Sequence, residues 1–302
     1  MIIFDTDMGL GTPGAEIDDG AALIFLLRAM GERVTAVTTT HGNTTVENAV
    51  HNSRRLLAYL ERTDVPLGRG AAQGLIEEKA WFADWQSVYG HTPPWPDESP
   101  LPLAANLIID TVRANPEQVT LIAVGPLTNL ALAVRLAPDI VPLVRQVVTM
   151  GGSLASEPEP EFNARCDPEA GHVVLNAGWS LRLIDLEITT QVPFTRADFA
   201  QLPGSHPALA LLKSQSAGWI DRMESMDWGH DSCALHDALA VAAVLDDSLF
   251  TWQETAVSVT LHPQNQRGIT RAVPQEGSLV ETAVSVDVER CHELIWHYLA
   301  IE

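Results

Sequence analysis

Residues 2–60 read IIFDTDMGLGTPGAEIDDGAALIFLLRAMGERVTAVTTTHGNTTVENAVHNSRRLLAYL and alternate short apolar runs with longer segments of helical period. Ile2–Asp5 and Val34–Thr39 have the composition and length of buried strands. Asp18–Met30, which ends at Gly31, and Val46–Leu60 have the period of helices. The first sixty residues therefore predict the order strand, helix, strand, helix.

The same alternation continues along the rest of the chain. We expect helices over Leu103–Ala114, from Pro126, from Pro168 and over His236–Leu245, strands over Val119–Val124, Val147–Met150 and Leu181–Leu186, β-hairpins over Thr255–Val286 and a closing helix from Val288. Strands that alternate with helices are typical of a mainly parallel sheet with helices on both faces. We therefore expect an α/β fold made of one domain, residues 1–302, in which ligands bind beyond the carboxyl ends of the strands.

Composition and charge exclude several classes of protein. The 302 residues are 46% apolar, and 18 basic against 39 acidic side chains leave a net charge of −21, which disfavours nucleic acid as a partner. No apolar run approaches the roughly 20 residues that cross a bilayer, and the N-terminus lacks the pattern of a signal peptide, so we expect a soluble, cytoplasmic protein. The three cysteines, Cys166, Cys233 and Cys291, are far apart and predict buried thiols rather than disulfides or a metal site.

One long segment, Leu75–Pro102, fits neither the helical nor the strand period. It is rich in tryptophan, proline and acidic residues, and we interpret it as an excursion or lid. Most tryptophans of the chain are expected in the core or at its rim. That assignment is least certain for four that flank polar, irregular stretches: Trp81, Trp85, Trp95 and Trp228.

Four carboxylates gather at the first junction between strand and helix. Asp5 and Asp7 end the first strand, and Asp18 and Asp19 open the next helix. Carboxylates this close together repel one another unless a cation lies among them, and oxygen ligands suit Ca²⁺ or Mg²⁺. Helix capping would explain one aspartate but not four. The sequence therefore predicts a site for a hard divalent cation.

A second candidate lies in LHDALAVAAVL, where His236 and Asp237 precede an apolar helix. An aspartate at this place is most often a helix cap, and a neighbouring histidine is most often an ordinary surface or core residue. The pair becomes a candidate only beside a metal site that needs another ligand.

A third candidate follows the strand that ends at Met150, where Glu161 and Asn163 flank Phe162. Polar residues beyond a strand end lie where ligands bind in α/β folds, and this pair could bind sugar hydroxyls. Asp167, a little further on, is equally well explained as a helix cap.

Asn43 follows another strand in HGNTT and is a further candidate for ligand contact, although asparagine is also common in turns. Gly9, Gly11 and Gly14 suggest a phosphate-binding loop, but no Gly-Lys-Ser/Thr follows them and their neighbours are acidic. We therefore reject a phosphate loop.

Taken together, these motifs resemble those of the nucleoside hydrolases, in particular the inosine-uridine preferring type. The motifs, in their order along the chain, are D-x-D-x-G (5–9), D-D-G-A-A (18–22), T-T-x-H-G-N (38–43), G-P-L-T-N-L-A (125–131), M-G-G (150–152), E-F-N (161–163), D-P-E-A (167–170) and L-H-D-A-L-A-V (235–241). Each motif alone is common, whereas the ordered set is specific. The resemblance runs from Ile2 to about Leu245 and more loosely through Arg267–Gly268.

Carried over position by position, the resemblance implies roles for particular residues. Asp7 would be a Ca²⁺ ligand and the base that activates the metal-bound water, with Asp19, Asp237 and the Val124 carbonyl as further ligands. The residues that would hold the ribose are Asp18, Asn43, Glu161 and Asn163. Separately from this carry-over, we expect His236 to protonate the departing base, because it directly precedes the proposed ligand Asp237.

The function that this resemblance implies is Ca²⁺-dependent hydrolysis of the N-glycosidic bond of ribonucleosides to base and ribose, in nucleoside salvage, by a homo-oligomer (dimer or tetramer). Two alternatives remain open at this point. A metal-dependent phosphatase also begins with D-x-D after a strand, but Gly9 stands where its usual Thr or Val would be. A non-catalytic nucleoside- or sugar-binding protein would keep the carboxylates without turnover.

The chain departs from the family pattern in three places. Asp19 follows Asp7 after 12 residues, whereas the family interval is five, so the loop between them carries an insertion. The usual Gly-Asn before E-F-N is missing, which leaves recognition of the ribose 5′ group open. The family's His-Gly-x-x-Gly segment is represented only by Tyr89–Gly90–His91, so an unusual base pocket is expected.

Overall fold

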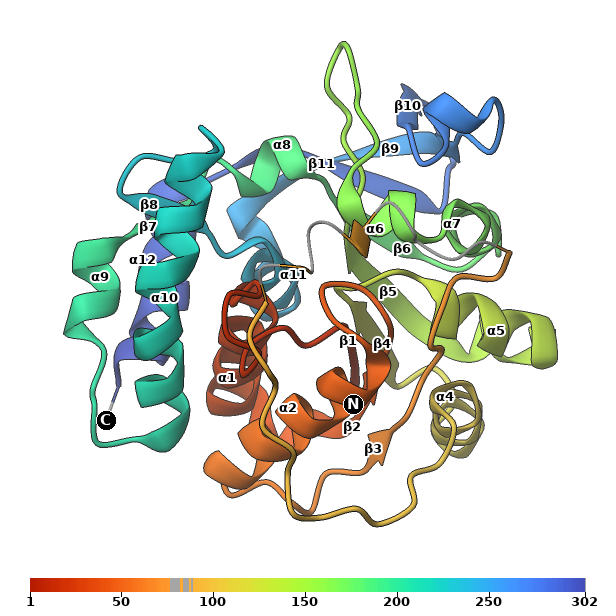
Figure 1. Ribbon diagram of the computed structural model, residues 1–302. Helices are drawn as coiled ribbons and strands as arrows, with labels where there is room; N and C mark the ends of the chain where they lie inside the picture. Colours follow the sequence, from red (N-terminus) through yellow and green to blue (C-terminus); the bar gives the residue numbers. More distant parts are fainter. Residues whose placement is uncertain (77–81, 84–86, 88, 302) are drawn as a thin grey trace.

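The computed structural model describes residues 1–76, 82–83, 87 and 89–301, and within them a nine-stranded sheet forms the centre of the molecule (Figure 1). Its strands, in spatial order, are β10 (Thr270–Pro274), β9 (Phe250–Val259), β11 (Val280–Val286), β6 (Leu181–Ile184), β5 (Val144–Met150), β4 (Val119–Ala123), β1 (Ile2–Thr6), β2 (Val34–Thr39) and β3 (Leu67–Gly68). All neighbours from β11 to β3 run parallel, whereas β9 is antiparallel to both β10 and β11. The mainly parallel sheet with hairpin additions is confirmed.

The hairpin region differs in detail from its prediction. β9 begins at Phe250, five residues before the predicted start. β11 is shared between the two parts of the sheet, because it pairs with β9 on one side and continues the parallel order beside β6 on the other. A small separate ribbon of β7 (Pro193–Thr195) and β8 (Ser232–Ala234) was not predicted, since three residues are too few to show a period.

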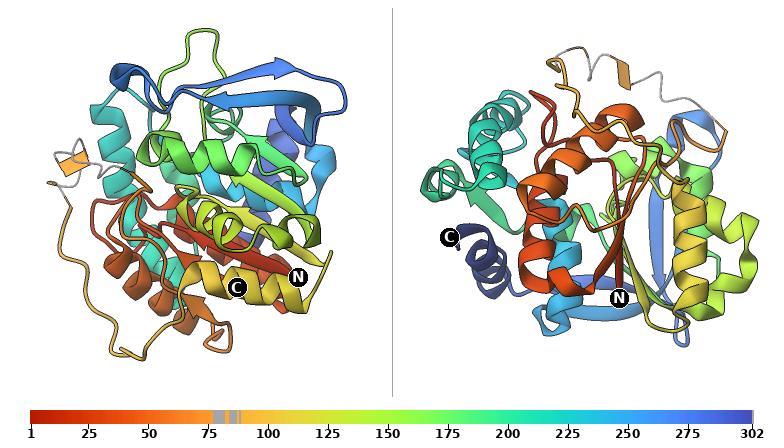
Figure 2. Two further views of the ribbon diagram at one scale, coloured as in Figure 1. Left: turned by 90° about the vertical axis from the view of Figure 1, so that its right-hand side faces the viewer. Right: turned by 90° about the horizontal axis from the view of Figure 1, so that it is seen from below.

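Helices cover both faces of the sheet (Figure 2). Their bounds are α1 (Asp18–Met30), α2 (Val46–Tyr59), α4 (Ala104–Ala114), α5 (Thr128–Leu136), α6 (Phe162–Cys166), α7 (Pro168–Leu175), α8 (Leu186–Thr189), α9 (Arg196–Gln201), α10 (Pro207–Ser225), α11 (His236–Leu245) and α12 (Val288–Ala300). α4, α5 and α7 pack on one face, and α1, α2 and α11 on the other, with α10 and α12 outside them. The short helices α6 and α8 were not predicted.

The alternation of side chains along β1 divides the core into two clusters. Ile2 and Phe4 pack on the face of α1 and α11, whereas Ile3 packs on the face of α4 and α5. Because both faces of the strand are buried, its sequence is continuously apolar up to Asp5. The polar residues begin only where the strand ends.

The longest described stretch of the expected lid, residues 89–102, is irregular and contacts α2. The Trp95 amide donates to His51 Nδ1 at 3.1 Å, and Arg55 donates to the Pro93 carbonyl. Trp81 and Trp85 lie outside the described residues, Trp95 is partly buried and Trp228 is 67% exposed. All three cysteines are buried thiols, as predicted. Among the described residues, no helix is long and apolar enough to cross a membrane.

Candidate active site

Asp7 lies directly after β1, at the carboxyl ends of the parallel strands. Asn43 follows β2, and its backbone amide donates to Asp7 Oδ2 at 2.6 Å. A Cβ added to Gly42 would overlap this carboxylate, and one added to Gly125 would lie 2.8 Å from Asp7 Oδ1. The two glycines therefore make room for the Asp7 carboxylate between the loops that follow β2 and β4.

Asp18, Asp19 and Asp237 lie together at the facing ends of α1 and α11. A carboxylate oxygen from each lies within 4.8 Å of the others, and all three side chains are buried. Asp18 Oδ2 accepts from the Asp237 amide at 3.4 Å, which joins the two helix starts. The N-cap of α1 is Ile17, with no side-chain capping bond, so helix capping does not account for this pair of aspartates.

Asp19 is connected to the first strand and to the loop after the second. It accepts hydrogen bonds from Thr6 Oγ1, from the Gly9 amide at 3.4 Å and from Asn43 Nδ2 at 3.3 Å. A further side-chain hydrogen bond links it to Asp7. The structure thus brings Asp7, Asp18, Asp19 and Asn43 together with Asp237. Asp5, which the sequence grouped with them, instead accepts hydrogen bonds from Thr38 Oγ1 and Asn129 Nδ2.

The electrostatics of this cluster favour a cation. Burial, followed by repulsion from neighbouring carboxylates, holds the pKa of Asp18 and Asp237 well above the usual value for aspartate. Burial also raises the pKa of Asp19, and raises that of Asp5 to about 7. A divalent ion would offset both the desolvation and the repulsion, and an all-oxygen donor set suits a hard one. Asp18, Asp19 and Asp237 could therefore hold a metal ion.

Glu161 and Asn163 lie across from this cluster, beyond β5. Glu161 caps α6 and accepts hydrogen bonds from the amides of Gly152 (2.7 Å), Asn163 (2.9 Å) and Ala164 (3.1 Å). Asn163 Nδ2 donates to the Val124 carbonyl at 2.9 Å. A carbonyl oxygen has two lone pairs, so this bond leaves Val124 able to accept one further contact. The short helix α6 thus fixes a pair that the sequence had placed in a loop.

His236 begins α11 and is held by α8. Its Nδ1 lies 2.7 Å from Thr189 Oγ1. Burial lowers the pKa of His236 to about 4, below the ordinary value near 6.5, so the neutral form is favoured at pH 7. No local sequence pattern indicates the contact with Thr189 of α8.

Asp167 has the structural role that one reading of the sequence gave it. Its Oδ1 accepts from the Ala170 amide at 3.0 Å, so it caps α7. Its Oδ2 accepts from Thr128 Oγ1 at 2.7 Å and from the Leu75 amide at 2.9 Å. Asp167 therefore ties together α5, α7 and the start of the irregular segment.

Sequence reasoning missed Glu16, which belongs to the inserted loop between Asp7 and Asp18. Its carboxyl group accepts a hydrogen bond from the Asn43 side chain. Burial, followed by repulsion from the charges of Asp19, Asp7 and Glu161, raises its pKa to about 8. The insertion itself was visible in the sequence, but nothing in its spacing showed which side chain would turn toward the aspartates.

Curated relatives align with almost the whole chain. The pyrimidine-specific ribonucleoside hydrolase RihA of Salmonella arizonae is 30% identical, over 96% of this chain and 94% of that protein. A probable uridine nucleosidase 2 of Oryza sativa subsp. japonica is 30% identical, over 85% of this chain and 77% of that protein.

Solved structures share the fold over the same length. A plant nucleoside hydrolase, PpNRh1, superposes with a TM-score of 0.82 at 29% identity, covering 100% of this chain and 99% of that one. A purine-preferring ribonucleoside hydrolase from Gardnerella vaginalis has the same fold, with a TM-score of 0.86 at 22% identity over 99% of this chain and 98% of that one. The model of the inosine-uridine preferring nucleoside hydrolase family matches residues 2–293, and this chain belongs to that family of N-glycosidases, the ribonucleoside hydrolases.

Proposed function

We propose that this ribonucleoside hydrolase works with one Ca²⁺, held by Asp7, Asp19, Asp237 and the Val124 carbonyl. The observation that carries the proposal is the burial of Asp18, Asp19 and Asp237 with their oxygens within 4.8 Å of one another, beside Asp7. Buried carboxylates repel one another unless protons or a cation neutralise them, and oxygen donors from backbone and carboxylate are the ligands that Ca²⁺ takes.

Asp7 is the proposed base. The Asn43 amide and the room left by Gly42 and Gly125 fix the orientation of its carboxylate, so it can take a proton from a water that attacks C1′ of the ribose. When bound, the cation supplies positive charge that lowers the pKa of water and balances the acidic cluster. The ribose then passes through an oxocarbenium-like transition state, as in other glycosidic hydrolyses.

The ribose hydroxyls are assigned to Asp18, Asn43, Glu161 and Asn163. Asp18 and Asn43 approach from α1 and from the loop after β2, and Glu161 and Asn163 approach from α6. Backbone amides already fix the Glu161 carboxylate, so binding the sugar orders little of the protein. This preorganisation favours recognition of a rigid polyol.

His236 is the proposed donor to the leaving base. Because its pKa lies near 4, it can donate at neutral pH only as the neutral tautomer that carries its proton on Nε2. That tautomer requires Nδ1 to accept a hydrogen bond from Thr189 Oγ1, which lies 2.7 Å away.

The decisive experiment is a panel of nucleosides with detection of free ribose. Uridine, cytidine, inosine, adenosine and guanosine are each assayed with Ca²⁺ and after exhaustive chelation. Release of ribose that chelation abolishes and Ca²⁺ restores supports the proposal. Turnover of a phosphomonoester instead would favour the phosphatase alternative, and binding without turnover would favour a nucleoside-binding protein.

The remaining expectations are proposals with simple tests. We propose that the chain forms one domain, because a single sheet takes strands from Ile2 to Val286. A role in nucleoside salvage is tested by growth on a ribonucleoside. A homo-oligomeric state, dimer or tetramer, is tested by light scattering. The net charge of −21 argues against nucleic acid as a partner.

A further inference from the structure

We propose that Glu16 is a substrate-recognition residue. Its carboxylate accepts a hydrogen bond from a donor group of the ribonucleoside other than the 2′- and 3′-hydroxyls. Two groups have this chemistry, the 5′-hydroxyl and an N–H of the base. The inference rests on the proposed function, because it places Glu16 at the same site.

The position of Glu16 separates it from the four aspartates. Asp7, Asp18, Asp19 and Asp237 are 0–3% exposed and form the floor of the site, whereas Glu16 is partly exposed. Its charge is nevertheless felt by residues on several sides, among them Asp18, Asp237, Cys233 and Arg222. Of these five carboxylates, only that of Glu16 keeps appreciable exposure to solvent.

The Asn43 side chain ties Glu16 to the floor. Its amide group donates both to Asp19 Oδ2, at 3.3 Å, and to Glu16. A substrate whose diol contacts Asp18 and Asn43 would therefore lie next to the Glu16 carboxylate. The diol itself is assigned to the floor, so the donors left to meet Glu16 are those at C5′ and on the base.

The loop that carries Glu16 is fixed by hydrogen bonds to three other parts of the molecule. Thr12 Oγ1 lies 2.6 Å from Thr92 Oγ1, and the Gly90 amide donates to the Pro13 carbonyl at 2.7 Å. The Gly11 amide donates to Gln215 of α10 at 3.0 Å. Asn52 of α2 also donates to the carbonyls of Met8 and Gly9, at 3.1 and 3.3 Å. A side chain on such a loop is preorganised.

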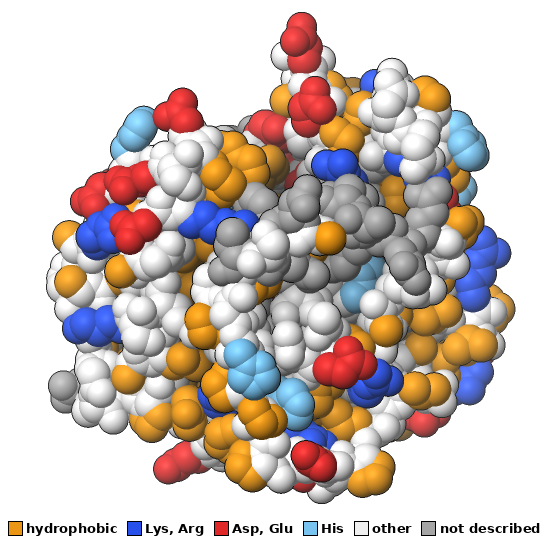
Figure 3. All heavy atoms as spheres, in the orientation of Figure 1, with side chains coloured by type: hydrophobic (Ala, Val, Ile, Leu, Met, Phe, Trp, Pro, Cys, Tyr) orange, Lys and Arg blue, Asp and Glu red, His pale blue; other side chains and the backbone are white. Residues whose placement is uncertain are grey.

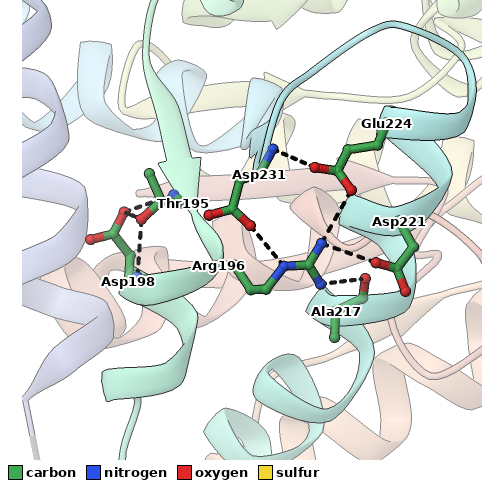
Figure 4. Close-up of polar contacts among 7 residues, drawn as sticks. All are labelled: Thr195, Arg196, Asp198, Ala217, Asp221, Glu224 and Asp231. Atoms are coloured by element: carbon green, nitrogen blue, oxygen red, sulfur yellow. Dashed lines mark hydrogen bonds and ion pairs between the residues drawn. The ribbon is translucent and has the colours of Figure 1, made fainter.

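α10, which holds this loop, is itself anchored. Arg196, at the start of α9, donates to Asp221 of α10 at 3.0 Å and to Asp231 at 2.8 Å, with Glu224 at 3.5 Å (Figure 4). The next residue of α10, Arg222, donates to the Gly14 carbonyl at 3.1 Å. The position of Glu16 thus depends on a continuous framework rather than on a free loop.

Glu16 differs from the acidic side chains of the surface, because its loop is anchored and its carboxylate accepts a hydrogen bond from the Asn43 side chain. On the face seen in Figure 3, acidic side chains also gather on the projecting loop between β5 and α6 and near α10, but those are exposed and solvated.

The test combines variants with substrate analogues. Glu16→Ala and Glu16→Gln are assayed on uridine, 5′-deoxyuridine and 3-methyluridine, and on inosine, 5′-deoxyinosine and 1-methylinosine. Glu32→Gln is the matched control, since Glu32 is exposed at the opposite end of the sheet. We expect both Glu16 variants to lose about 10- to 100-fold in kcat/KM on the parent nucleoside, the range of a hydrogen bond to a charged group. On the analogue that lacks the recognised donor the loss should fall below about threefold.

The outcomes separate this proposal from its alternatives. A loss that disappears on the 5′-deoxy analogues identifies the 5′-hydroxyl, and one that disappears on the N-methyl analogues identifies the base. An equal loss on all analogues overturns the proposal. A tenfold weaker Ca²⁺ affinity of Glu16→Ala, measured by calorimetry, also overturns it, because Glu16 would then be a metal ligand. Failure of the unaltered protein to hydrolyse any nucleoside would instead reject the proposed function.

Discussion

Gly42 lies so close to Asp7 that a Cβ added to it would overlap Oδ2 and Cγ of Asp7. The next amide, that of Asn43, donates to the same oxygen at 2.6 Å. One short loop after β2 therefore sets both the position and the orientation of the proposed base.

Gly42→Ala should displace Asp7 and reduce kcat by at least about 100-fold, because small misplacements of a reacting group have effects of this size. Gly218→Ala is the matched control, since nothing lies within 4 Å of a Cβ at that position of α10 and alanine favours a helix. Circular dichroism checks that both variants fold. Full activity of a folded Gly42→Ala would show that Asp7 need not occupy this position.

Removal of calcium should abolish turnover and lower Tm, by an amount that grows with pH. Without metal, the raised pKa values of Asp18, Asp237 and Glu16 mean that the folded protein holds protons that the unfolded chain releases. Stability without metal therefore falls as pH rises toward about 8, the pKa of Glu16. Ca²⁺ at 100 times its Kd would add about 2.7 kcal/mol.

The measurement is a thermal melt with chelator or Ca²⁺ at pH 6.5, 7.5 and 8.5. His236 does not interfere in this range. Its pKa is lowered by folding, so its effect on stability appears only as pH falls from 6.5 toward 4. Asp237→Asn should lose the Ca²⁺ response, and Asp110→Asn, an exposed control on α4, should keep it. A Ca²⁺-induced change in Tm that is the same at every pH would contradict this account.

A 2′-deoxynucleoside should be a poor substrate, by up to roughly 10⁴-fold in kcat/KM, because the buried polar groups that meet the hydroxyl would be left without a partner. Asn163→Ala should weaken hydrolysis of the ribonucleoside more than that of its deoxy analogue. Asn176→Ala, on the exposed end of α7, serves as control. Equal kcat/KM for the ribo and deoxy substrates would show that the ribose assignment is wrong.

The fold was predictable because its local patterns are strong. The bounds of α1, Asp18–Met30, and of β2, Val34–Thr39, agree with the sequence prediction residue for residue. Gly31 ends the first helix and β-branched residues fill the strand, so local preference and burial point the same way. The topology also accounts for the meeting of Asp7, Asp19 and Asn43, since parallel strands bring their carboxyl ends to one edge of the sheet.

What the sequence could not predict depends on contacts between distant segments. Glu16 turns toward Asn43 because α2 and α10 hold its loop, and neither contact leaves a local pattern. Burial in the fold lowers the pKa of His236, and its ring contacts Thr189, which is 47 residues away in the sequence. The role of Asp167 as a helix cap was one of two equal readings, and only the fold decided between them.

Asp185 and Glu187 should make stability depend on pH at a place away from the aspartate cluster. Burial, then a hydrogen bond to Glu187, raises the pKa of Asp185 to about 7, while Leu154 donates its amide to both carboxyl groups. Because this pKa is raised by folding, Asp185 contributes fully to stability below its pKa in the unfolded chain, and the contribution is lost as pH rises through 7. Between pH 5 and 8, the free energy of unfolding of Asp185→Asn should therefore fall by about 1–3 kcal/mol less than that of the unaltered protein, as measured by urea unfolding. Asp139→Asn, an exposed control paired with Arg113, should keep the wild-type profile.

His236 should matter only for leaving groups that need a proton. His236→Ala is expected to slow hydrolysis of uridine or inosine by about 10²–10⁴-fold, the usual range for general acid catalysis, and to spare p-nitrophenyl riboside, whose phenolate leaves without a proton. An equal loss on both substrates would mean that the variant has disturbed Asp237, which is adjacent, and no loss on either would remove His236 from the mechanism.

The tautomer of His236 gives a second test of the same role. Thr189 has one hydroxyl proton and two acceptors within reach, His236 Nδ1 at 2.7 Å and the Leu186 carbonyl at 3.1 Å. If Nδ1 accepts the Thr189 proton in a hydrogen bond, the imidazole must carry its own proton on Nε2, from which it can donate a hydrogen bond to the departing base. Thr189→Val should then reduce nucleoside hydrolysis while sparing p-nitrophenyl riboside, whereas Thr190→Val, which alters only an exposed hydroxyl on the Leu186 carbonyl, should leave both rates unchanged. Unchanged nucleoside hydrolysis in Thr189→Val would show that His236 does not depend on this hydrogen bond to donate its proton.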